Sequence, residues 1–444
     1  PLLAVWEPSA PRASFSCRFY SYGYNTRTYR QPRFFTFVDR VREKLIQELR
    51  SDVLVVGAGP AGCMAAIELA GRGVNVLVVD RSQFPREKIC GDGLLEDSLE
   101  VLEGAGLATA VRDKAHAIGS IRFVAPNGNT CDLEGDFYTL RRSELDALLL
   151  EKACDRGASF LAGIQVKGPL LNGDNCVGAL GVDEEGNEVR IAASLVLLAT
   201  GANSRILSAF GVLEAKRHNA IGIRGYFRVG EDFDESVMIV SYDPRLLPGY
   251  GWMFPLGEGT VNVGCGIFLD GRRKMPQFGE NLTTFYQHVE PLASYLRGAE
   301  RIAPIQAAHM RTGLRGARAY APGLLVLGEA LGLTFAFIGE GISCALESGR
   351  IASSAAIEAL GKGDFSRQGL ARYERDLRQS LEGRHRGYLA AQQWFRFKPM
   401  ANLIISRAAR HEAVRKVARQ IICGQRDVED VFSLRGMARV LLLR

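Results

Sequence analysis

The sequence predicts an α/β fold with three parts: a parallel-sheet domain assembled from non-contiguous segments, an inserted and mostly antiparallel β-sheet domain, and a helical C-terminal cap. The first part is predicted by a βαβ unit, in which the apolar run Val53–Val56, a helical pattern and a second strand, Val74–Val79, follow one another. The second part is predicted by residues 119–134 and 221–268, where apolar and polar residues alternate as in antiparallel strands. After Gly363 the pattern is helical and basic to the end.

The bulk composition is that of a soluble globular chain, since 47% of the 444 residues are hydrophobic and 23% are charged. No uncharged apolar run reaches the length of a membrane span, so none is predicted. The nine cysteines and six histidines are scattered without the spacing of a disulfide framework or a metal site. We therefore expect reduced thiols, no metal and a cytoplasmic location.

The net charge of +6 is unevenly distributed. Residues 1–50 carry a net charge of +5 and residues 384–444 carry +9, so the residues between them carry −8. A nucleic-acid-binding protein would have a basic body, so no nucleic-acid partner is expected. The distribution favours a catalytic body with an appended surface-binding element.

The first fifty residues are predicted to lie outside the fold. From Pro8 to Val38 the chain has five arginines and no acidic residue, a composition typical of a transit peptide and equally compatible with a simple arm. Glu43–Arg50 is predicted to form a short helix that leads into the first strand.

The turn of the βαβ unit carries a glycine pattern, G-x-G-x-x-G. Gly57 allows a tight turn, Gly59 allows the backbone to approach a pyrophosphate, and Gly62 allows helix and strand to pack closely. The helix N-terminus then directs N–H groups at the phosphates, and Asp80, at the end of the second strand, can accept hydrogen bonds from ribose hydroxyls. A lone glycine pattern is a weak signal, but its place between strand and helix predicts a Rossmann-type dinucleotide site. The predicted contacts are Gly57, Gly59, Pro60, Ala61, Gly62, Asp80 and Arg81.

Two later segments also join a buried strand to a glycine-rich turn, and they favour an extended cofactor such as FAD over NAD. The first is Leu195–Ser204, and the second is Leu325–Gly332 with the following Gly339–Ile342. Such turns bring backbone close to a flat cofactor, and a helix that opens at Gly341 can stabilise negative charge on a reduced flavin. The simpler alternative is two ordinary strand–turn–helix units. The residues predicted to contact the cofactor here are Gly201, Gly328, Glu329, Gly339, Gly341 and Ile342.

Three motifs are more specific. The pattern P-x-Y-x-W-x-F-P occupies Pro248–Pro255 and is followed, eight residues later, by the G-x-G of Gly264–Gly266. The other two are Pro85–Gly93 (PREKICGDG) and Arg142–Asp146 (RSELD). Together they resemble the geranylgeranyl reductase family of FAD-dependent oxidoreductases, which has the p-hydroxybenzoate hydroxylase-like flavoprotein fold. The resemblance covers about residues 51–444.

The resemblance implies roles for residues that composition and spacing do not single out. It implies that residues 85–93 lie along the flavin, which adds Lys88, Cys90 and Gly91 to the cofactor-binding residues, and that Arg142 contacts FAD. Cys90 and Gly91 thereby become the catalytic candidates, with Cys90 as a residue that shapes the site, although most cysteines are inert packing residues. Asp92 is a further candidate. His309 is expected to be structural.

The aromatic residues of the first motif, Tyr250, Trp252 and Phe254, alternate and so project from one face of a strand. They can line an apolar tunnel for an isoprenoid chain, or they can fill the core between sheet and helix. The residues alone favour the core, and the resemblance favours the tunnel. We therefore predict these three as substrate-binding residues.

The chain departs from the family pattern at two positions. It has Gly328-Glu329-Ala330 where Gly-Asp-Ala is usual, and Ala336 where a proline is common. The longer carboxylate of Glu329 either still reaches the ribityl hydroxyls or shifts the flavin. These changes bear on substrate geometry more than on FAD binding.

The implied reaction is reduction of carbon–carbon double bonds in a prenyl (geranylgeranyl-type) chain, carried by a lipid or a diphosphate, with hydride from reduced flavin. NAD(P)H and ferredoxin are both open as electron donors. One alternative is a flavin-dependent monooxygenase or halogenase with an apolar substrate, although the chain lacks a halogenase-like W-x-W-x-I-P motif. Another is a non-catalytic flavin-binding membrane adaptor.

The basic C-terminal helices, expected at Leu403–Arg410 and Val414–Ile422, either make a peripheral membrane contact or pack on the body. The expected organisation is an N-terminal extension, three FAD-binding segments that alternate with two substrate-domain segments, and the basic helical region. Their predicted ranges are 1–50 for the extension; 51–115, 141–214 and 311–362 for FAD binding; 116–140 and 215–310 for the substrate domain; and 363–444 for the helical region.

Overall fold

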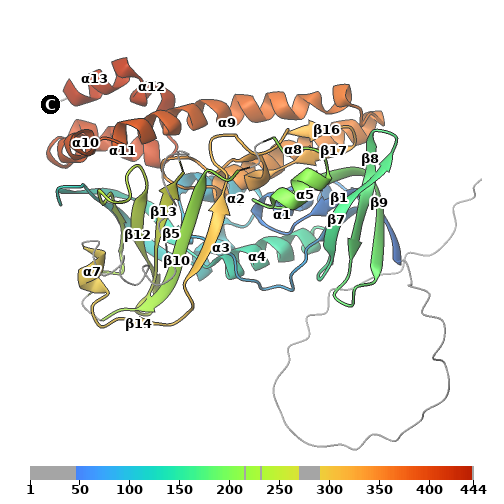
Figure 1. The fold of residues 1–444 in the computed structure, drawn as a ribbon, viewed down its shortest axis with the longest axis horizontal. Coiled ribbons are helices and arrows are strands. Elements are labelled where there is room, and N and C mark those ends of the chain that lie inside the picture. Colours follow the sequence, from blue (N-terminus) through green and yellow to red (C-terminus); the bar gives the residue numbers. More distant parts are fainter. Residues whose placement is uncertain (1–46, 215–216, 231–232, 270–290, 443–444) are drawn as a thin grey trace, which may run out of the picture. The chain divides into compact units, whose positions relative to one another are not determined.

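The computed structural model describes residues 47–214, 217–230, 233–269 and 291–442 (Figure 1). All of them fall in one of the two units into which the chain divides. The transit-peptide-like segment lies outside the described residues. Two β-sheets and a set of long C-terminal helices make up the described part.

The first sheet has the strand order β16-β17-β9-β1-β2-β6, with the β7–β8 hairpin attached to β9. Its central strands are parallel, and only β16 pairs antiparallel at the edge of this path. The strands are β1 (Gln47–Val56), β2 (Val76–Val79), β6 (Ser159–Leu161), β7 (Gln165–Asn172), β8 (Asn175–Val182), β9 (Glu188–Leu198), β16 (Tyr320–Ala321) and β17 (Leu324–Val326).

The βαβ prediction is confirmed: α1 (Pro60–Ala70) connects β1 to its parallel neighbour β2. The valine-rich end of β1 is buried because α1 covers the sheet, and α1 packs in turn against α4 (Arg142–Asp155) and α8 (Ile342–Lys362). A parallel sheet with helices on its face buries such a continuous apolar run.

Two predicted helices differ in the structure. The helix expected at residues 43–50 is wrong from Gln47 onward, since Gln47 to Arg50 extend β1 and pair with Val189 to Ala192 of β9. Tertiary pairing here overrides helix propensity, so the first strand begins at Gln47. The helix expected at 96–116 is divided into α2 (Glu96–Gly104) and α3 (Ala108–Lys114), because Gly106 adopts a positive φ of 70°.

The second sheet has the order β14-β10-β13-β12-β11-β4-β5-β3, with β15 paired to β10. Every neighbouring pair is antiparallel except β4–β11, so the predicted antiparallel character is confirmed. The strands are β3 (Gly93–Leu94), β4 (His116–Val124), β5 (Thr130–Thr139), β10 (Ala220–Arg228), β11 (Val237–Ser241), β12 (Tyr250–Gly257), β13 (Thr260–Phe268), β14 (Glu300–Arg301) and β15 (Gln306–Met310).

This sheet separates two cores. Trp252 of β12 belongs to the main core, which also contains the residues of the first sheet, whereas the adjacent Met253 belongs to a second core on the other face. The alternation along β12 therefore directs one set of side chains toward the first sheet. The remaining short elements are α5 (Ser204–Ala209), α7 (Leu292–Tyr295) and the 3₁₀ turn η1 (Gly328–Leu331).

The C-terminal cap is helical, as predicted. In Figure 1, α9 runs over α8 as a long helix, and the shorter helices cluster beyond its end. The helices are α9 (Arg367–Phe395), α10 (Lys398–Arg410), α11 (Glu412–Ile422), α12 (Val428–Phe432) and α13 (Leu434–Leu442). Both α10 and α11 pack on β5, and α11 buries its apolar residues Val414, Val417 and Ile421.

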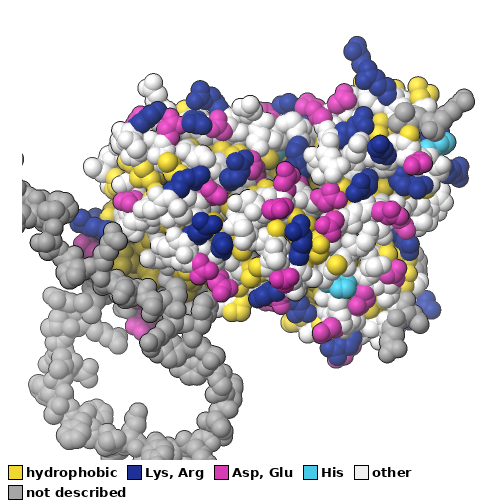
Figure 2. Space-filling model, turned by 180° about the vertical axis from the view of Figure 1, so that it is seen from behind, with side chains coloured by type: hydrophobic (Ala, Val, Ile, Leu, Met, Phe, Trp, Pro, Cys, Tyr) yellow, Lys and Arg dark blue, Asp and Glu magenta, His cyan; other side chains and the backbone are white. Residues whose placement is uncertain are grey.

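The surface carries mixed charge. Figure 2 shows basic and acidic side chains interspersed over the body on the face in view. Within the described ranges, no helix combines the length and the apolar character that crossing a membrane requires. In the same ranges, no cluster of three or more metal-ligating side chains is present. The structure assigns strands to sheets but not domain boundaries, which stay predictions.

Candidate active site

One cavity of about 1230 Å³ lies between the two sheets and is lined by residues from both. Its size exceeds that of a typical small-ligand pocket and suits an extended cofactor together with part of a second molecule. The predicted residues that line it are Gly57, Gly59, Pro60, Ala61, Asp80, Arg81, Lys88, Cys90, Gly91, Arg142, Gly201, Tyr250, Trp252, Phe254, Gly328, Glu329, Gly339, Gly341 and Ile342. Gly62 is buried behind the cavity wall.

The glycine turn at the start of α1 has two glycines that the fold requires and one that it does not. Gly57 has φ of 108°, and a Cβ there would lie 2.4 Å from the carbonyl oxygen of Ala199. A Cβ at Gly62 would lie 2.0 Å from the carbonyl oxygen of Gly57. At Gly59 the nearest atom would be Nη2 of Arg86 at 3.6 Å. Gly59 therefore borders open space at a helix N-terminus, which is the cradle that a diphosphate needs.

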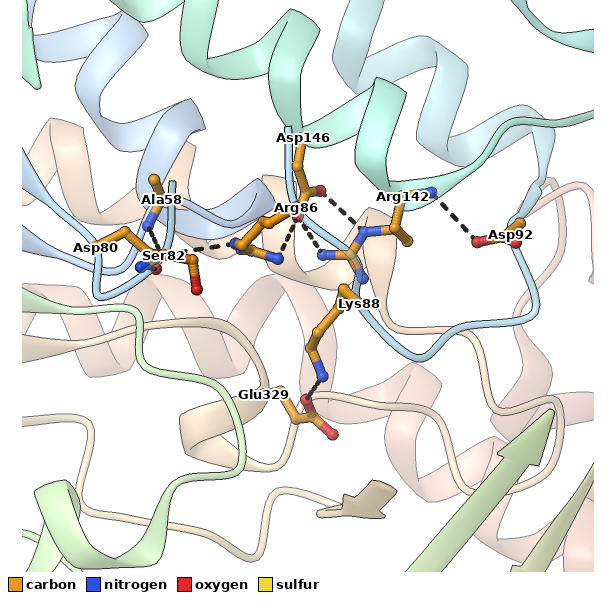
Figure 3. Close-up of polar contacts among 9 residues, drawn as sticks. All are labelled: Ala58, Asp80, Ser82, Arg86, Lys88, Asp92, Arg142, Asp146 and Glu329. Carbon is orange, nitrogen blue, oxygen red and sulfur yellow. Dashed lines mark hydrogen bonds and ion pairs between the residues drawn. The ribbon is translucent and has the colours of Figure 1, made fainter. Parts of the chain in front are cut away.

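Asp80 organises the loops on either side of this cradle (Figure 3). Its Oδ2 accepts a hydrogen bond from the backbone N–H of Ala58 at 2.9 Å, and its Oδ1 accepts one from Ser82 at 3.0 Å. Each carboxylate oxygen retains acceptor capacity toward the cavity. The position at the end of β2 thus suits the ribose contact that the sequence predicts.

A buried carboxylate holds two arginines at the cavity. Oδ1 and Oδ2 of Asp146 each lie 2.9 Å from Arg142, from Nε and Nη2 respectively, and Nη1 of Arg86 lies 3.1 Å from Oδ2 (Figure 3). Asp146 is fully buried, so neither guanidinium competes with water for it. Asp146 therefore fixes two cationic groups, Arg142 of the same motif and Arg86 of the PREKICGDG motif, and guanidinium groups are of the kind that bind phosphate.

On the opposite side of the cavity, Glu329 extends toward Lys88, with 3.9 Å between Oε2 and Nζ (Figure 3). A Cβ at Gly201 would lie 3.7 Å from the same Oε2. The turns after β9 and β17 are thus adjacent, as expected of neighbouring parallel strands. The buried hydroxyl of Thr200, beside Gly201, has no hydrogen-bond partner among the described residues.

These features together fit FAD. The open cradle, the ribose-side carboxylate, the paired arginines and the N-terminus of α8 border one continuous cavity. Gly59 would hold the diphosphate of FAD, and the loop of residues 88–93 is the side on which the family resemblance expects the flavin.

Tyr250, Trp252 and Phe254 form an aromatic wall, named here for these three residues. Their ring centroids are 6.0 Å and 6.3 Å apart along the strand. Tyr250 and Trp252 are only 8% and 7% exposed, yet all three side chains line the cavity. A Cβ at Gly91 would lie 3.3 Å from Cε2 of Phe254, so the wall touches the loop on the cofactor side. The wall is therefore both part of the core and part of the cavity surface.

Asp92 is the centre of a network that the sequence analysis did not find. Its carboxylate is fully buried, and its Oδ2 accepts hydrogen bonds from the hydroxyl of Tyr226 and from Nδ2 of Asn262, each at 2.7 Å. Burial raises the pKa of Asp92 to about 6. The available signal was the single asparagine in the apolar run Val261–Ile267, since a buried polar side chain requires a partner.

Cys90 is half-buried at the cavity, and burial raises the pKa of its thiol above its ordinary value. A neutral thiol lacks the nucleophilic character of a thiolate. The catalytic assignment of Cys90 and Gly91 therefore stays a prediction, and shaping of the site suits the geometry better. His309 stacks on His218, with centroids 4.8 Å apart.

Comparison with known proteins agrees with this geometry. A model of the FAD binding domain matches residues 50–376. The menaquinone reductase of Mycolicibacterium smegmatis is 33% identical over 318 residues, which cover 68% of this chain and 76% of that protein. Digeranylgeranylglycerophospholipid reductase 1 of Methanopyrus kandleri is 32% identical over 330 residues, which cover 73% of this chain and 84% of that protein.

Solved structures share the fold. A geranylgeranyl bacteriochlorophyll reductase-like protein from Thermoplasma acidophilum has a TM-score of 0.73 at 22% identity, with 89% of this chain and 96% of that chain covered. The flavin-dependent brominase Bmp2 has a TM-score of 0.70 at 19% identity, with 88% and 98% covered. Such identities establish the fold alone, whereas the sequence relatives are reductases. This chain therefore belongs to the geranylgeranyl reductase family of FAD-dependent oxidoreductases.

Proposed function

We propose that the protein reduces carbon–carbon double bonds in a prenyl chain. The names of both reductase relatives refer to isoprenoid lipids, which supports this substrate class. The observation that carries the proposal is the position of the aromatic wall, which lines the same cavity as the cofactor residues and touches the loop at Gly91.

Each part of the cavity has a defined task in this proposal. Gly59 and the N-terminus of α1 bind the diphosphate of FAD, and Arg86 and Arg142 add positive charge beside it. Asp80 accepts hydrogen bonds from the ribose hydroxyls. When bound, FAD supplies the hydride chemistry. The aromatic wall aligns the apolar chain and excludes water, and such alignment is the larger part of what a protein contributes to this kind of step.

The test is an anaerobic reoxidation experiment. Holoenzyme is photoreduced without oxygen, a geranylgeranyl lipid is added, and the return of oxidised-flavin absorbance is followed. The fully saturated phytanyl analogue is the matched control. Reoxidation by the unsaturated lipid alone, with a saturated product by mass spectrometry, is the expected result. Because reduced flavin reoxidises in air whatever the function, an oxygenated or halogenated product formed on admission of air would instead indicate a monooxygenase or halogenase, and no product with or without air would indicate an adaptor.

The electron donor belongs to the same proposal. NAD(P)H and reduced ferredoxin are the two candidates, because both deliver electrons to flavins. Mixing oxidised holoenzyme with each donor under anaerobic conditions distinguishes them by the rate of flavin bleaching. The scattered thiols support a reducing, cytoplasmic location.

We further propose that the cap contacts a membrane surface, since prenyl lipids reside there. On α13, Leu434 and Leu442 are 78% and 79% exposed, and Arg435 and Arg439 lie on the same short helix. Exposed leucines beside arginines are typical of helices that lie on anionic bilayers. Leu434→Asp should weaken co-sedimentation with phosphatidylglycerol vesicles. Leu171→Asp, at an exposed leucine of the β7–β8 hairpin, is the control and should not; equal binding by both variants would exclude the cap.

A further inference from the structure

Asn262 of β13 connects the aromatic wall to the loop on the cofactor side. Its Oδ1 accepts a hydrogen bond from Nε1 of Trp252 at 3.0 Å. Its Nδ2 donates to the carbonyl oxygen of Cys90 at 2.8 Å and to Oδ2 of Asp92 at 2.7 Å. The side chain is fully buried, so water does not replace any of these contacts. One amide thus links two segments that are separated by more than 150 residues.

The chemistry of the partners fixes the orientation of this amide. The indole of Trp252 is only a donor, whereas the Cys90 carbonyl and the Asp92 carboxylate are acceptors. A flipped amide would place its NH₂ group against a donor and its oxygen against two acceptors. The assignment therefore follows from the network, and the network has a single satisfied arrangement.

Asp92 anchors the loop end of the network. Its backbone adopts a φ of 64°, which is uncommon for a residue with a side chain. Its Oδ1 accepts a hydrogen bond from the backbone N–H of Arg142 at 3.3 Å, and its Oδ2 accepts the Tyr226 hydroxyl at 2.7 Å. The loop is thereby tied to the start of α4 and to β10, as well as to Asn262.

Trp252 is constrained on a second side by Gly264. A Cβ at Gly264 would lie 2.1 Å from Cζ2 of the indole, so the ring occupies the space that a side chain would take. Gly264 is opposite Trp252 in the β12–β13 register. Packing against this glycine sets the plane of the ring, and the hydrogen bond to Asn262 sets its direction.

We propose that Asn262 is a positioning residue that holds the Trp252 indole and the cofactor-side loop in one fixed arrangement. Its consequence for turnover depends on the function proposed above. A prenyl chain has no polar group with which the aromatic wall could form a hydrogen bond. The shape of the wall therefore determines which double bond lies over the cofactor. A ring that is free to turn would loosen this alignment, and small misplacements cost rate more than affinity.

The experiment compares Asn262→Leu with Asn219→Leu. Asn219 is the matched control, because its side chain also makes three hydrogen bonds, all to Thr312, and it neither lines the cavity nor touches the network. Trp252→Phe, alone and combined with Asn262→Leu, completes a double-mutant cycle. Three quantities are measured: the indole N–H resonance of Trp252, the Kd for FAD, and kcat and KM for the prenyl substrate.

We expect Asn262→Leu to shift or broaden the Trp252 indole resonance and to lower kcat by roughly 100-fold, with KM and the Kd for FAD changed less than about threefold. Asn219→Leu should leave the resonance and kcat of the folded protein unchanged. In the double-mutant cycle, adding Asn262→Leu to Trp252→Phe should lower kcat little further than Trp252→Phe does alone. Additive losses, or an unchanged indole resonance in Asn262→Leu, would overturn the proposal.

The resonance and the FAD affinity also separate this proposal from the function on which it rests. If wild-type protein turns over no prenyl substrate, the proposed function fails, while the indole resonance still decides whether Asn262 holds Trp252. If Asn262→Leu does not fold, Asn262→Asp replaces it. That variant retains an acceptor for Trp252 but replaces the two N–H donors to Cys90 and Asp92 by at most one proton shared with Asp92, because two adjacent buried carboxyl groups do not both ionise. An unaltered FAD site and turnover would count against the link to the loop.

Discussion

Arg142 and Asp146 form a two-point contact across one turn of α4, with Nε and Nη2 of the arginine each 2.9 Å from a carboxylate oxygen. The contact is buried, and the spacing of four residues is the one that places two side chains together on a helix face. Because the same carboxylate also holds Arg86, the motif fixes two cations at the cavity rather than one. The RSELD motif thus supplies the carboxylate that holds two guanidinium groups at the cavity.

Replacement of Asp146 should weaken FAD binding without removing either arginine. In Asp146→Asn the amide satisfies only part of the guanidinium contacts, so Arg86 and Arg142 lose their fixed directions. We expect the Kd for FAD to rise by about 10- to 100-fold, as measured by quenching of flavin fluorescence. Asp132→Asn is the control, since Asp132 makes the same two-point contact with Arg122 on the surface. Equal losses of FAD affinity in Asp146→Asn and Asp132→Asn would contradict the assignment of Asp146 to the FAD site.

The glycines of the first turn should separate folding from cofactor binding. In Gly59→Ala the nearest atom to the new Cβ is Nη2 of Arg86, at 3.6 Å. The apoprotein should therefore keep its Tm, whereas its affinity for FAD should fall at least about tenfold. In Gly62→Ala the new Cβ would lie 2.0 Å from the carbonyl oxygen of Gly57. Because this contact is a clash, the variant should destabilise the apoprotein by about 1–3 kcal/mol or more. Thermal unfolding of the apoproteins and FAD titration measure both. Retention of full FAD affinity by Gly59→Ala would show that the diphosphate lies elsewhere.

The two faces of β12 should respond differently to truncation. Trp252→Ala removes part of the aromatic wall, so kcat/KM for the prenyl substrate should fall by roughly 100-fold while FAD is retained. Met253→Ala opens a void in the second core and should cost about 2–5 kcal/mol of stability, with turnover per folded molecule preserved. Urea unfolding and steady-state kinetics on both variants make the comparison. If Trp252→Ala lowers the free energy of unfolding but leaves kcat/KM unchanged, the aromatic wall is only part of the hydrophobic core.

Asp92 should make stability depend on pH in a defined direction. Burial raises its pKa from 3.8 to about 6, although Tyr226, Asn262, Arg224 and Arg142 act to lower it. Because the folded state binds this proton more tightly than the unfolded state, the contribution is full below pH 3.8 and is lost as the pH rises through about 6. The shift corresponds to a loss of about 3 kcal/mol across that window.

Asp92→Asn removes this titration, so the unfolding free energy of the wild type should decline relative to the variant between pH 4.5 and 7.5, by about 2 kcal/mol of the full change of about 3 kcal/mol. Urea unfolding of the apoproteins at several pH values measures the difference. Tyr226→Phe removes a hydrogen bond that stabilises the carboxylate and should move the transition to higher pH. A constant difference between wild type and Asp92→Asn would contradict the raised pKa.

Much of the cofactor site could be predicted because its signals are local. The positive φ of Gly57 belongs to its own turn, the tight space at Gly62 is set mainly by the Gly57 carbonyl five residues earlier, and Asp80 follows from the length of a βαβ unit. The shared face of Tyr250, Trp252 and Phe254 follows from strand periodicity. Whether that face met core or cavity was not decidable from periodicity, and the structure shows that it meets both.

Other features required the tertiary structure. Gln47 begins a strand rather than continuing the helix expected at Glu43–Arg50, because its partner, Val189, comes from a distant part of the chain. The role of Asn262 could not be predicted from its apolar strand, because its partners Cys90 and Asp92 lie 172 and 170 residues earlier in the chain.

The amino-acid sequence by itself determined the βαβ unit, its glycine turn and the aromatic face, because these depend on residues near one another along the chain, and the resemblance of motifs within residues 51–444 pointed to FAD. The tertiary structure alone decided how the wall is joined to the cofactor loop, because a buried hydrogen bond is specified by where two distant strands meet and not by either strand's own pattern.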